Sequence, residues 1–546
     1  MSASQKKSLR KAQQTAQMTE RQLHEQKEAK KLKVYTAVFT GVLALILVLA
    51  VVFGITKFIS NNGIMEKNTI AATVGTHELT NAELNYYFVD QVNDFYNDYG
   101  SYASLLGLDL TKPLDKQVTN AETGATWADD FITAALSAAQ HNYALADAAK
   151  AAGFELSEEQ IKSLDTDLAT MALYATLYGY GDTDAYLRAM YGKGASEESF
   201  REYMMTQTLA TAYYNHYANS LTYDASVIEA EDQANAVKYS NYNYNAYYML
   251  VSRFYEGGTK DENGTTTYST EEQAAGLAKA EETAKALAEG GYATVEELDA
   301  AIAALSINEG STTASSTNYN NTAYDSINQF IREWITDSSR KAGDMTYIAN
   351  TSTSTVDGVE TTTVNGYYVV MYHGVEDNTF FLPNVRHILI QPEGGTYNST
   401  TGLYDYTEEE MAAAKLEAQV LLDEFKAGKA TSMDFADLAN EHSADGDGTT
   451  GGLYEKILPG QMVANFNDWC FAEGRQAGDT GLVESDYGWH IMYYEGDSDV
   501  TYREYLVEYA LRAVDVDAWY ASRIEATAIT ALNTNYVNKG LVLSNG

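Results

Sequence analysis

Two segments of this chain repeat each other. Residues 334–344 read WITDSSRKAGD, and residues 469–479 read WCFAEGRQAGD. The tryptophan, the arginine and the closing Ala-Gly-Asp coincide at a spacing of 135 residues. Further along, NGYYVVMYHG at 365–374 parallels YGWHIMYYEG at 487–496. A repeat of this length indicates two structural units that fold alike.

Each copy predicts the same order of elements. A strand, AYYMLVS at 246–252 or VRHILIQ at 385–391, precedes a long Ala-rich helix. An irregular middle, a short helix and a closing hairpin follow. We therefore expect two tandem α+β domains, at residues 240–376 and 380–498.

The part before the repeat has helical patterns. Thr80 and Glu83 have the spacing of a capping box, and apolar residues recur at helical intervals behind them. Similar patterns occupy 127–152, 157–178 and 196–221. They predict an all-helical module over residues 66–238. A closing helix within residues 500–546, from Tyr502 to about Leu532, is expected to join it.

The N-terminal region combines a basic segment with an apolar one. Residues 1–33 hold nine Lys and Arg against three Glu, and residues 34–56 contain no charged residue. Those 23 positions span roughly 34 Å as a helix, enough to cross a bilayer core. The basic flank places residues 1–33 in the cytoplasm and the bulk of the chain outside the membrane. A cleaved signal peptide is the alternative, but its apolar region is usually shorter.

Composition excludes several classes of protein. The chain has 546 residues and a net charge of −40, which argues against nucleic-acid binding because phosphate contacts need dense Lys and Arg. A single cysteine, Cys470, excludes a disulfide framework. We read Cys470 as a buried apolar residue rather than a redox group. No pattern for a cofactor, nucleotide or hydrolase site occurs.

Five blocks in the second copy resemble a known family. They read VRHILI, DFADLANEHSADGDGTTGG, PGQMVANF, AGDTGLV and YGWHI, at 385–390, 434–452, 459–466, 477–483 and 487–491. In this order they resemble the parvulin, or rotamase, family of peptidyl-prolyl cis/trans isomerases. The whole chain resembles membrane-anchored extracytoplasmic foldases of the PrsA and SurA kind. The resemblance is strongest in the second copy and weak in the first, which looks degenerate.

The resemblance implies roles for individual residues. Catalytic roles fall to His387, Asp445, His490 and Ser485. The pocket for the proline ring would be formed by Met462, Phe466, Tyr454 and Ile457. Two of these depart from the family pattern, because Tyr454 stands in place of a leucine and Ile457 in place of an aromatic residue.

The chemistry of the reaction suits such residues. Rotation about a peptide bond must overcome ~18–20 kcal/mol of resonance, and an X–Pro bond differs little in energy between its isomers. A catalyst therefore needs an apolar slot that favours the twisted amide, with hydrogen bonds tuned to the carbonyl, and no cofactor or metal. The run from Asp445 to Gly448 is read as a turn, with a weak calcium loop as the alternative.

In the first copy, Tyr248 aligns with His387 and Tyr368 with His490. We therefore expect it to be inactive and to serve as a binding or spacer domain.

The function expected is isomerisation of X–Pro bonds in unfolded or newly secreted proteins. The alternatives are a holdase chaperone with inactive parvulin domains and a surface adhesion protein. The clients and the oligomeric state stay open.

Overall fold

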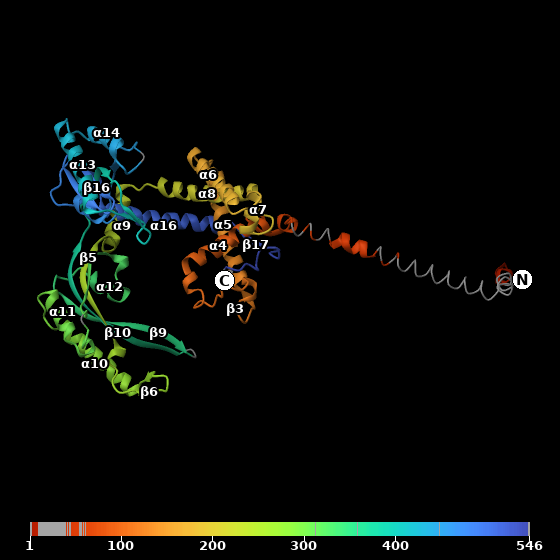
Figure 1. The fold of residues 1–546 in the computed structure, drawn as a ribbon. Helices are drawn as coiled ribbons and strands as arrows, with labels where there is room; N and C mark the ends of the chain where they lie inside the picture. Colours follow the sequence, from red (N-terminus) through yellow and green to blue (C-terminus); the bar gives the residue numbers. More distant parts are fainter. Residues whose placement is uncertain are drawn as a thin grey trace. The chain divides into compact units, whose positions relative to one another are not determined.

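The computed structural model describes residues 3–8, 40, 42, 45–53, 57, 59, 62–311, 313–356, 359–446 and 448–543 (Figure 1). Most of the basic tail predicted at 1–33 and much of the membrane segment predicted at 34–56 lie outside these residues. Within the described ranges, no helix has both the length and the apolar character needed to cross a bilayer. The membrane segment at 34–56 therefore stays a prediction.

The chain forms two compact units. The first comprises the residues up to Leu221 and those from Val514 onward, and the second comprises Thr222–Ala513. The division falls inside α16 (Tyr502–Ala526). Helix α9 (Ala225–Asn235), which we assigned to the helical module, belongs to the second unit.

Helices dominate the first unit. They are α3 (Ile64–Asn68), α4 (Asn81–Tyr99), α5 (Trp127–Ala151), α6 (Glu158–Leu177), α7 (Thr183–Tyr191) and α8 (Glu197–Ser220). The predicted capping box at the start of α4 is confirmed, because the Glu83 amide donates to the Thr80 hydroxyl at 3.2 Å and the Glu83 carboxylate accepts from the Thr80 amide at 2.7 Å. The core gathers α4, α5 and α8 around buried aromatic residues such as Tyr86 and Phe88.

A small sheet also belongs to this unit, so the prediction of an all-helical module is wrong in this respect. Strands β1 (Ile70–Val74), β2 (His77–Thr80) and β17 (Ile529–Ala531) form an antiparallel sheet in the order β17-β1-β2. Helix α16 ends at Ala526, before the predicted end near Leu532. The following residues satisfy the free edge of β1 instead, with Ala72 paired to Ala531.

The second unit holds two sheets of the same strand order. The first copy has the order β8-β5-β10-β9, and the second has β14-β11-β16-β15. In chain order the first copy consists of β5 (Asn241–Leu250), α10 (Thr270–Ala288), α11 (Val295–Ala303), β8 (Thr317–Ala323), α12 (Gln329–Ile335), β9 (Met345–Val356) and β10 (Val359–Glu376). The second consists of β11 (Phe381–Ile390), α13 (Glu408–Ala427), α14 (Ser432–His442), β14 (Leu453–Tyr454), α15 (Ala464–Cys470), β15 (Thr480–Ser485) and β16 (Gly488–Thr501). The elements correspond one to one, as the repeat predicts.

Short hairpins complete the described elements. They are β3 (Val118–Asn120) with β4 (Ala125–Thr126), β6 (Thr259–Lys260) with β7 (Thr266–Thr267), and β12 (Thr396–Asn398) with β13 (Leu403–Asp405).

The sheet of the second copy has a different core on each face. Ile388 and Ile491 face the core formed with α13 and α14. Val385 and Met492 face a second core, which also contains Phe466 of α15. Because side chains alternate along a strand, His387 lies on the α15 face with Val385, and His490 lies there with Met492.

The strand register shows which residues of the two copies correspond. Tyr368 of β10 pairs with Ile348 of β9, and His490 of β16 pairs with Val483 of β15. The spacings of 122 and 135 residues between these positions are those of the sequence repeat. Tyr368 therefore occupies the place of His490, as predicted.

The predicted counterpart of His387 is wrong by two residues. His387 pairs with Met492, and the counterpart of Met492 is Val370, which pairs with Ala246. Tyr248 instead lies directly opposite Tyr368. A shift of two residues keeps every side chain on its face of the sheet, so the tyrosine-rich strand gave no local sign of the error.

Candidate active site

Two buried histidines meet on the α15 face of the second sheet. His387 of β11 is 4% exposed and His490 of β16 is 6% exposed. Their strands are antiparallel neighbours, with Leu389 opposite His490 and His387 opposite Met492. This diagonal placement brings the two Nδ1 atoms to 3.2 Å. The structure therefore brings together the histidine pair that the sequence predicts.

Asp445 completes the pair from the loop after α14. Its Oδ2 lies 2.9 Å from Nε2 of His387. The loop is fixed to the end of β11, because the Ala444 amide donates to the Leu389 carbonyl at 2.9 Å and the Leu389 amide donates to the Ser443 hydroxyl at 3.1 Å. A carboxylate held in this way orients the imidazole beside it.

Ser485 holds the other end of the pair. Its hydroxyl lies 2.7 Å from Nε2 of His490, at the end of β15. The Tyr487 amide donates to the same hydroxyl oxygen at 3.2 Å. All four predicted catalytic side chains, His387, Asp445, His490 and Ser485, therefore form one connected network.

The hydrogen bonds run in one chain from Asp445 to Ser485. The Nε2–H of His387 donates to Asp445, the two Nδ1 atoms share one proton between them, and Nε2 of His490 faces the Ser485 hydroxyl. The Asp445 carboxylate is then ionised. All four ring nitrogens are engaged, which leaves none to attack a substrate.

The titration behaviour fits this assignment. The hydrogen bond from His387 lowers the pKa of Asp445 to about 2, against the opposing effect of burial. Burial, with a smaller contribution from the nearby His387, lowers the pKa of His490 to about 4. Near neutral pH, Asp445 is therefore ionised and His490 is neutral.

Aromatic and apolar side chains close the site. Phe466 of α15 meets both imidazoles edge to face, with ring centroids 5.2 Å from His387 and 5.4 Å from His490. The Tyr454 ring lies 5.3 Å from His387, and its hydroxyl donates to Asp445 at 3.1 Å. Met462 packs against the same core. Ile457 is fully buried within that core, so we place it behind the pocket rather than in its wall.

Two consecutive glycines, Gly451 and Gly452, let the chain pass close to its neighbours beside the site. The Gly452 carbonyl accepts from the His387 amide at 2.9 Å, and Gly452 has a φ of +65°. A Cβ at Gly452 would lie 2.1 Å from the His387 carbonyl oxygen. Only glycine permits this approach, which explains the second glycine of the Gly-Gly in the DFADLANEHSADGDGTTGG block.

A cavity beside Ser485 escaped the sequence reasoning. Its volume is about 530 Å³, and its lining includes Tyr404 and Asp405 of the β12–β13 hairpin and Asn465 of α15. The Gly- and Thr-rich turn between residues 394 and 402 signals a hairpin. Nothing local in the sequence places that hairpin beside Ser485.

The structure also bears on two other predictions, the burial of Cys470 and the calcium-loop alternative. Cys470 is buried, and burial raises its thiol pKa to about 12, so it is not a nucleophile. In the described part of the chain, no cluster of three or more His, Cys, Asp or Glu side chains could hold a metal ion. Asp447, which would belong to the calcium-loop alternative, lies outside the described residues.

The first copy has a different group at the same place. Ala246 replaces the first histidine, and Tyr368 replaces the second. The rings of Tyr248 and Tyr368 lie 4.6 Å apart. Asn350 donates to the Tyr248 hydroxyl at 3.2 Å, and Asn328 donates to the Tyr368 hydroxyl at 3.1 Å. The copy lacks the imidazole pair, and its inactivity stays a prediction.

Two families of domains match the chain. The family of PPIC-type PPIase domains matches residues 368–495, which include the histidine pair. This chain carries a parvulin-type peptidyl-prolyl isomerase domain. The family of SurA-like N-terminal domains matches residues 26–213, which cover most of the helical module. The chain thus combines a segment that matches PPIC-type isomerase domains with a helical module that matches SurA-like N-terminal domains.

Solved structures similar to the chain align over limited parts. The PPIase domain of TbPar42 is 19% identical, with 20% of this chain and 98% of that domain covered and a TM-score of 0.17. PrsA from Bacillus anthracis is 18% identical over 28% of this chain, with a TM-score of 0.18. PrsA from Bacillus cereus is 19% identical over 30% of this chain, with a TM-score of 0.18. The alignments span 59% and 57% of those two PrsA chains. None of the curated proteins matches this chain.

Proposed function

We propose that this protein is a membrane-anchored extracytoplasmic foldase that speeds cis/trans exchange of X–Pro bonds in secreted or cell-envelope proteins. The observation that carries the proposal is the fully hydrogen-bonded pair of His387 and His490 beneath Phe466, within a parvulin domain. The helical module, which matches SurA-like N-terminal domains, would hold unfolded clients.

Catalysis by this site would act through positioning. Uncatalysed exchange takes roughly 10–100 s, and the barrier is the resonance lost when the amide twists. An apolar wall that grips the proline ring and excludes water favours the twisted amide over the planar one. The fixed hydrogen bonds around His387 and His490 need no reorganisation as charge moves along the amide.

Covalent catalysis has little support at this site. Every imidazole nitrogen of the pair already has a partner, and so has the Ser485 hydroxyl. The Cys470 thiol is buried and protonated at neutral pH. An isomerisation breaks no bond of the substrate, so none of these groups has to act as a nucleophile.

Anchoring rests on the N-terminal sequence. The basic segment at 1–33 and the uncharged apolar run at 34–56 support a single-pass signal anchor with a cytoplasmic N-terminus. The parvulin domain and the helical module would then lie outside the membrane. The chain has a single cysteine and therefore forms no disulfide within itself.

Refolding of a client limited by a proline isomerisation tests the proposal with the full chain in lipid nanodiscs. We expect the wild type to speed the slow refolding phase and to suppress aggregation. His387→Ala should lose the first effect and keep the second. In a separate experiment on cell membranes, the full chain should stay in the membrane pellet after carbonate extraction.

Three results would count against this assignment. Suppressed aggregation without faster refolding favours the holdase alternative. Loss of both effects in the folded wild type removes the foldase proposal. Release of the chain by carbonate removes the anchor.

A further inference from the structure

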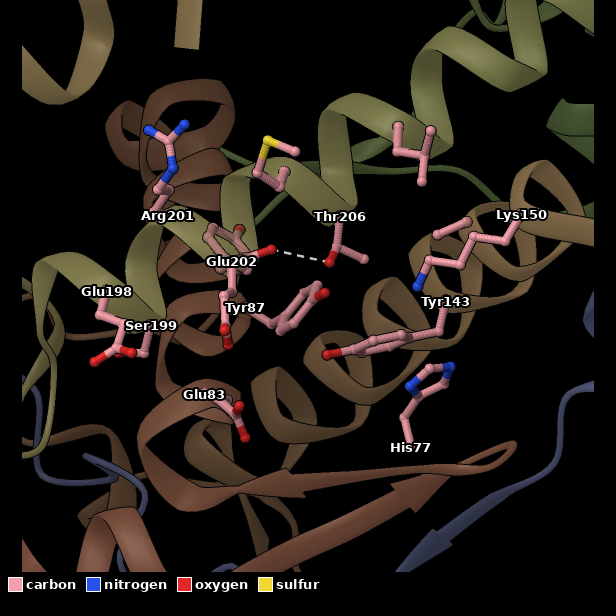
Figure 2. A pocket seen from close by; sticks show the side chains of 14 residues that line it. His77, Glu83, Tyr87, Tyr143, Lys150, Glu198, Ser199, Arg201, Glu202 and Thr206 are labelled. Carbon is pink, nitrogen blue, oxygen red and sulfur yellow. Dashed lines mark hydrogen bonds between the residues drawn. The ribbon is translucent and has the colours of Figure 1, made fainter. Parts of the chain in front are cut away.

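A cavity of about 590 Å³ lies inside the helical module of the first unit. Its walls come from β2, α4, α5 and α8, and Figure 2 shows the side chains that line it. The residues that matter here are Tyr87, Tyr143, Lys150, Glu198, Glu202 and Tyr203. None of them belongs to the isomerase site, so the cavity needs its own explanation.

Aromatic rings form much of the wall. The Tyr87 and Tyr203 rings meet edge to face, with centroids 4.8 Å apart. His77 stacks on Tyr143 at 4.3 Å, and its Nε2 is held 2.9 Å from a carboxylate oxygen of Asp147. Such ring faces suit an aliphatic stem and a cationic head group.

The Tyr87 hydroxyl is a buried polar group that is poorly satisfied. Tyr87 is 3% exposed, and its hydroxyl lies near the Asn142 side chain without a well-aligned hydrogen bond to it. Burial raises the pKa of Tyr87 above its ordinary value, and the neighbouring Asn142 side chain has a smaller, opposing effect. The hydroxyl is therefore neutral and can accept a hydrogen bond from a ligand. A buried hydroxyl left unpaired is costly, which points to a missing partner.

Negative charge gathers at one side of the cavity. Glu198 and Glu202 line it, both residues are exposed, and neither forms an ion pair with another described residue. Burial raises the pKa of Tyr143 to about 12, with further contributions from the charges of Glu83 and Glu202. Burial is the main cause of this shift, and the carboxylates add a negative potential around the Tyr143 hydroxyl, which attracts a cation.

Neither of the two basic side chains that line the cavity, Arg201 and Lys150, is paired with Glu198 or Glu202. The Arg201 guanidinium is paired with Asp165, which does not line the cavity. Figure 2 shows Lys150 on the opposite side of the cavity from Glu198. A ligand that carries a cation can therefore reach the carboxylates, while Lys150 can bind a main-chain carbonyl oxygen of the same ligand.

We propose that this cavity binds a lysine or arginine side chain of an unfolded client segment. The inference rests on the proposed chaperone function and names the client chemistry that the helical module selects. The head group binds Glu198, Glu202 and the Tyr87 hydroxyl. The aliphatic stem packs on Tyr143 and Tyr203. The net charge of −40 favours the approach of such segments.

Peptide binding to the full chain in a neutral detergent tests this proposal by calorimetry. The probes are proline-free decapeptides that differ only in a central lysine, arginine, norleucine or glutamate. We expect the lysine and arginine peptides to bind about three- to tenfold more tightly than the norleucine peptide, a preference typical of partly exposed charge pairs. The glutamate peptide should bind most weakly.

Variants assign the preference to the cavity. The double variant Glu198→Gln/Glu202→Gln should bind the lysine and norleucine peptides equally. Glu197→Gln is the matched control, because Glu197 lies on the same helix, is exposed like Glu198 and Glu202, and does not line the cavity. Tyr87→Phe should weaken lysine binding alone, without lowering Tm, because it removes a hydroxyl that forms no well-aligned hydrogen bond in the free protein.

The outcomes separate this inference from the function on which it rests. Equal affinity for the lysine and norleucine peptides, with aggregation still suppressed, overturns the cation site and leaves the chaperone function. A preference that survives in the double variant overturns it as well. Absence of both peptide binding and aggregation suppression overturns both proposals.

Discussion

Phe466→Ala is expected to remove most of the isomerase activity and to destabilise the parvulin domain. Phe466 is 2% exposed and touches both histidines. Truncation of a buried phenylalanine costs about 3–5 kcal/mol of unfolding free energy. Loss of the apolar contact with the proline ring, worth about 2–3 kcal/mol, lowers kcat/KM by roughly 10²-fold. Exchange of X–Pro peptides and hydrogen exchange in β11 and β16 measure the two effects.

A matched control lies in the first copy. Ile331 of α12 is 135 residues before Phe466 and is 1% exposed in the equivalent core. Ile331→Ala should cost about 2–5 kcal/mol in the first copy and leave kcat/KM unchanged. Phe466→Leu keeps most of the volume, so a folded variant with low activity is expected. Full activity in Phe466→Leu and in Phe466→Ala would contradict the proposed pocket.

The second large effect concerns pH. The pKa of His490 is about 4 in the folded protein, against an ordinary value of 6.5 for histidine. Between these values the unfolded chain binds more protons than the folded one, so stability falls as pH falls from 6.5 to about 4. The gap corresponds to about 3 kcal/mol of unfolding free energy. This contribution is complete above pH 6.5 and is lost below about 4.

His490→Gln isolates this contribution, because glutamine does not titrate in the range. Chemical denaturation at a series of pH values measures the difference in unfolding free energy between the wild type and the variant. This difference should decline as the pH falls from 6.5 to about 4. Asp445 adds a loss only at lower pH, since its folded pKa is about 2 against an ordinary value of 3.8 for aspartate. Parallel curves for wild type and variant would show that His490 is not buried in its neutral form.

The isomerase site could be predicted from the sequence because its residues fall in or next to blocks that occur in the order typical of the family. His387, Asp445, Ser485 and His490 lie in or next to these blocks, and the structure joins them in one network. The course of the hydrogen bonds was not predictable. It depends on distances between side chains of β11, β15, β16 and the loop after α14, which no local pattern encodes.

Two errors have specific physical causes. Tyr248 was aligned with His387 in place of Ala246 because the strand NYNYNAYYML places similar residues on each face. Two registers of the alignment therefore fit equally well. The sheet of the helical module was missed because β17 is only three residues long. Its pairing with β1 joins residues more than 450 positions apart, beyond the reach of periodicity.

The cavity of the helical module illustrates a third limit. Tyr87 and Glu202 lie on α4 and α8, and each fits the polar or apolar pattern of its own helix. Only the packing of α4, α5 and α8 brings a poorly satisfied hydroxyl and carboxylates without ion pairs to the same space. Tertiary structure therefore supplies a candidate binding site where the sequence suggests ordinary helices.

Catalysed cis/trans exchange of short X–Pro peptides is the most direct test of the central claim, measured by NMR line shapes with the full chain and several residues before proline. The wild type should accelerate exchange, and both His387→Ala and Asp445→Ala should lose the acceleration while their far-UV spectra and thermal transitions stay native. No acceleration by the folded wild type, or full acceleration by both variants, would contradict the assignment of His387, His490 and Asp445 as the isomerase site.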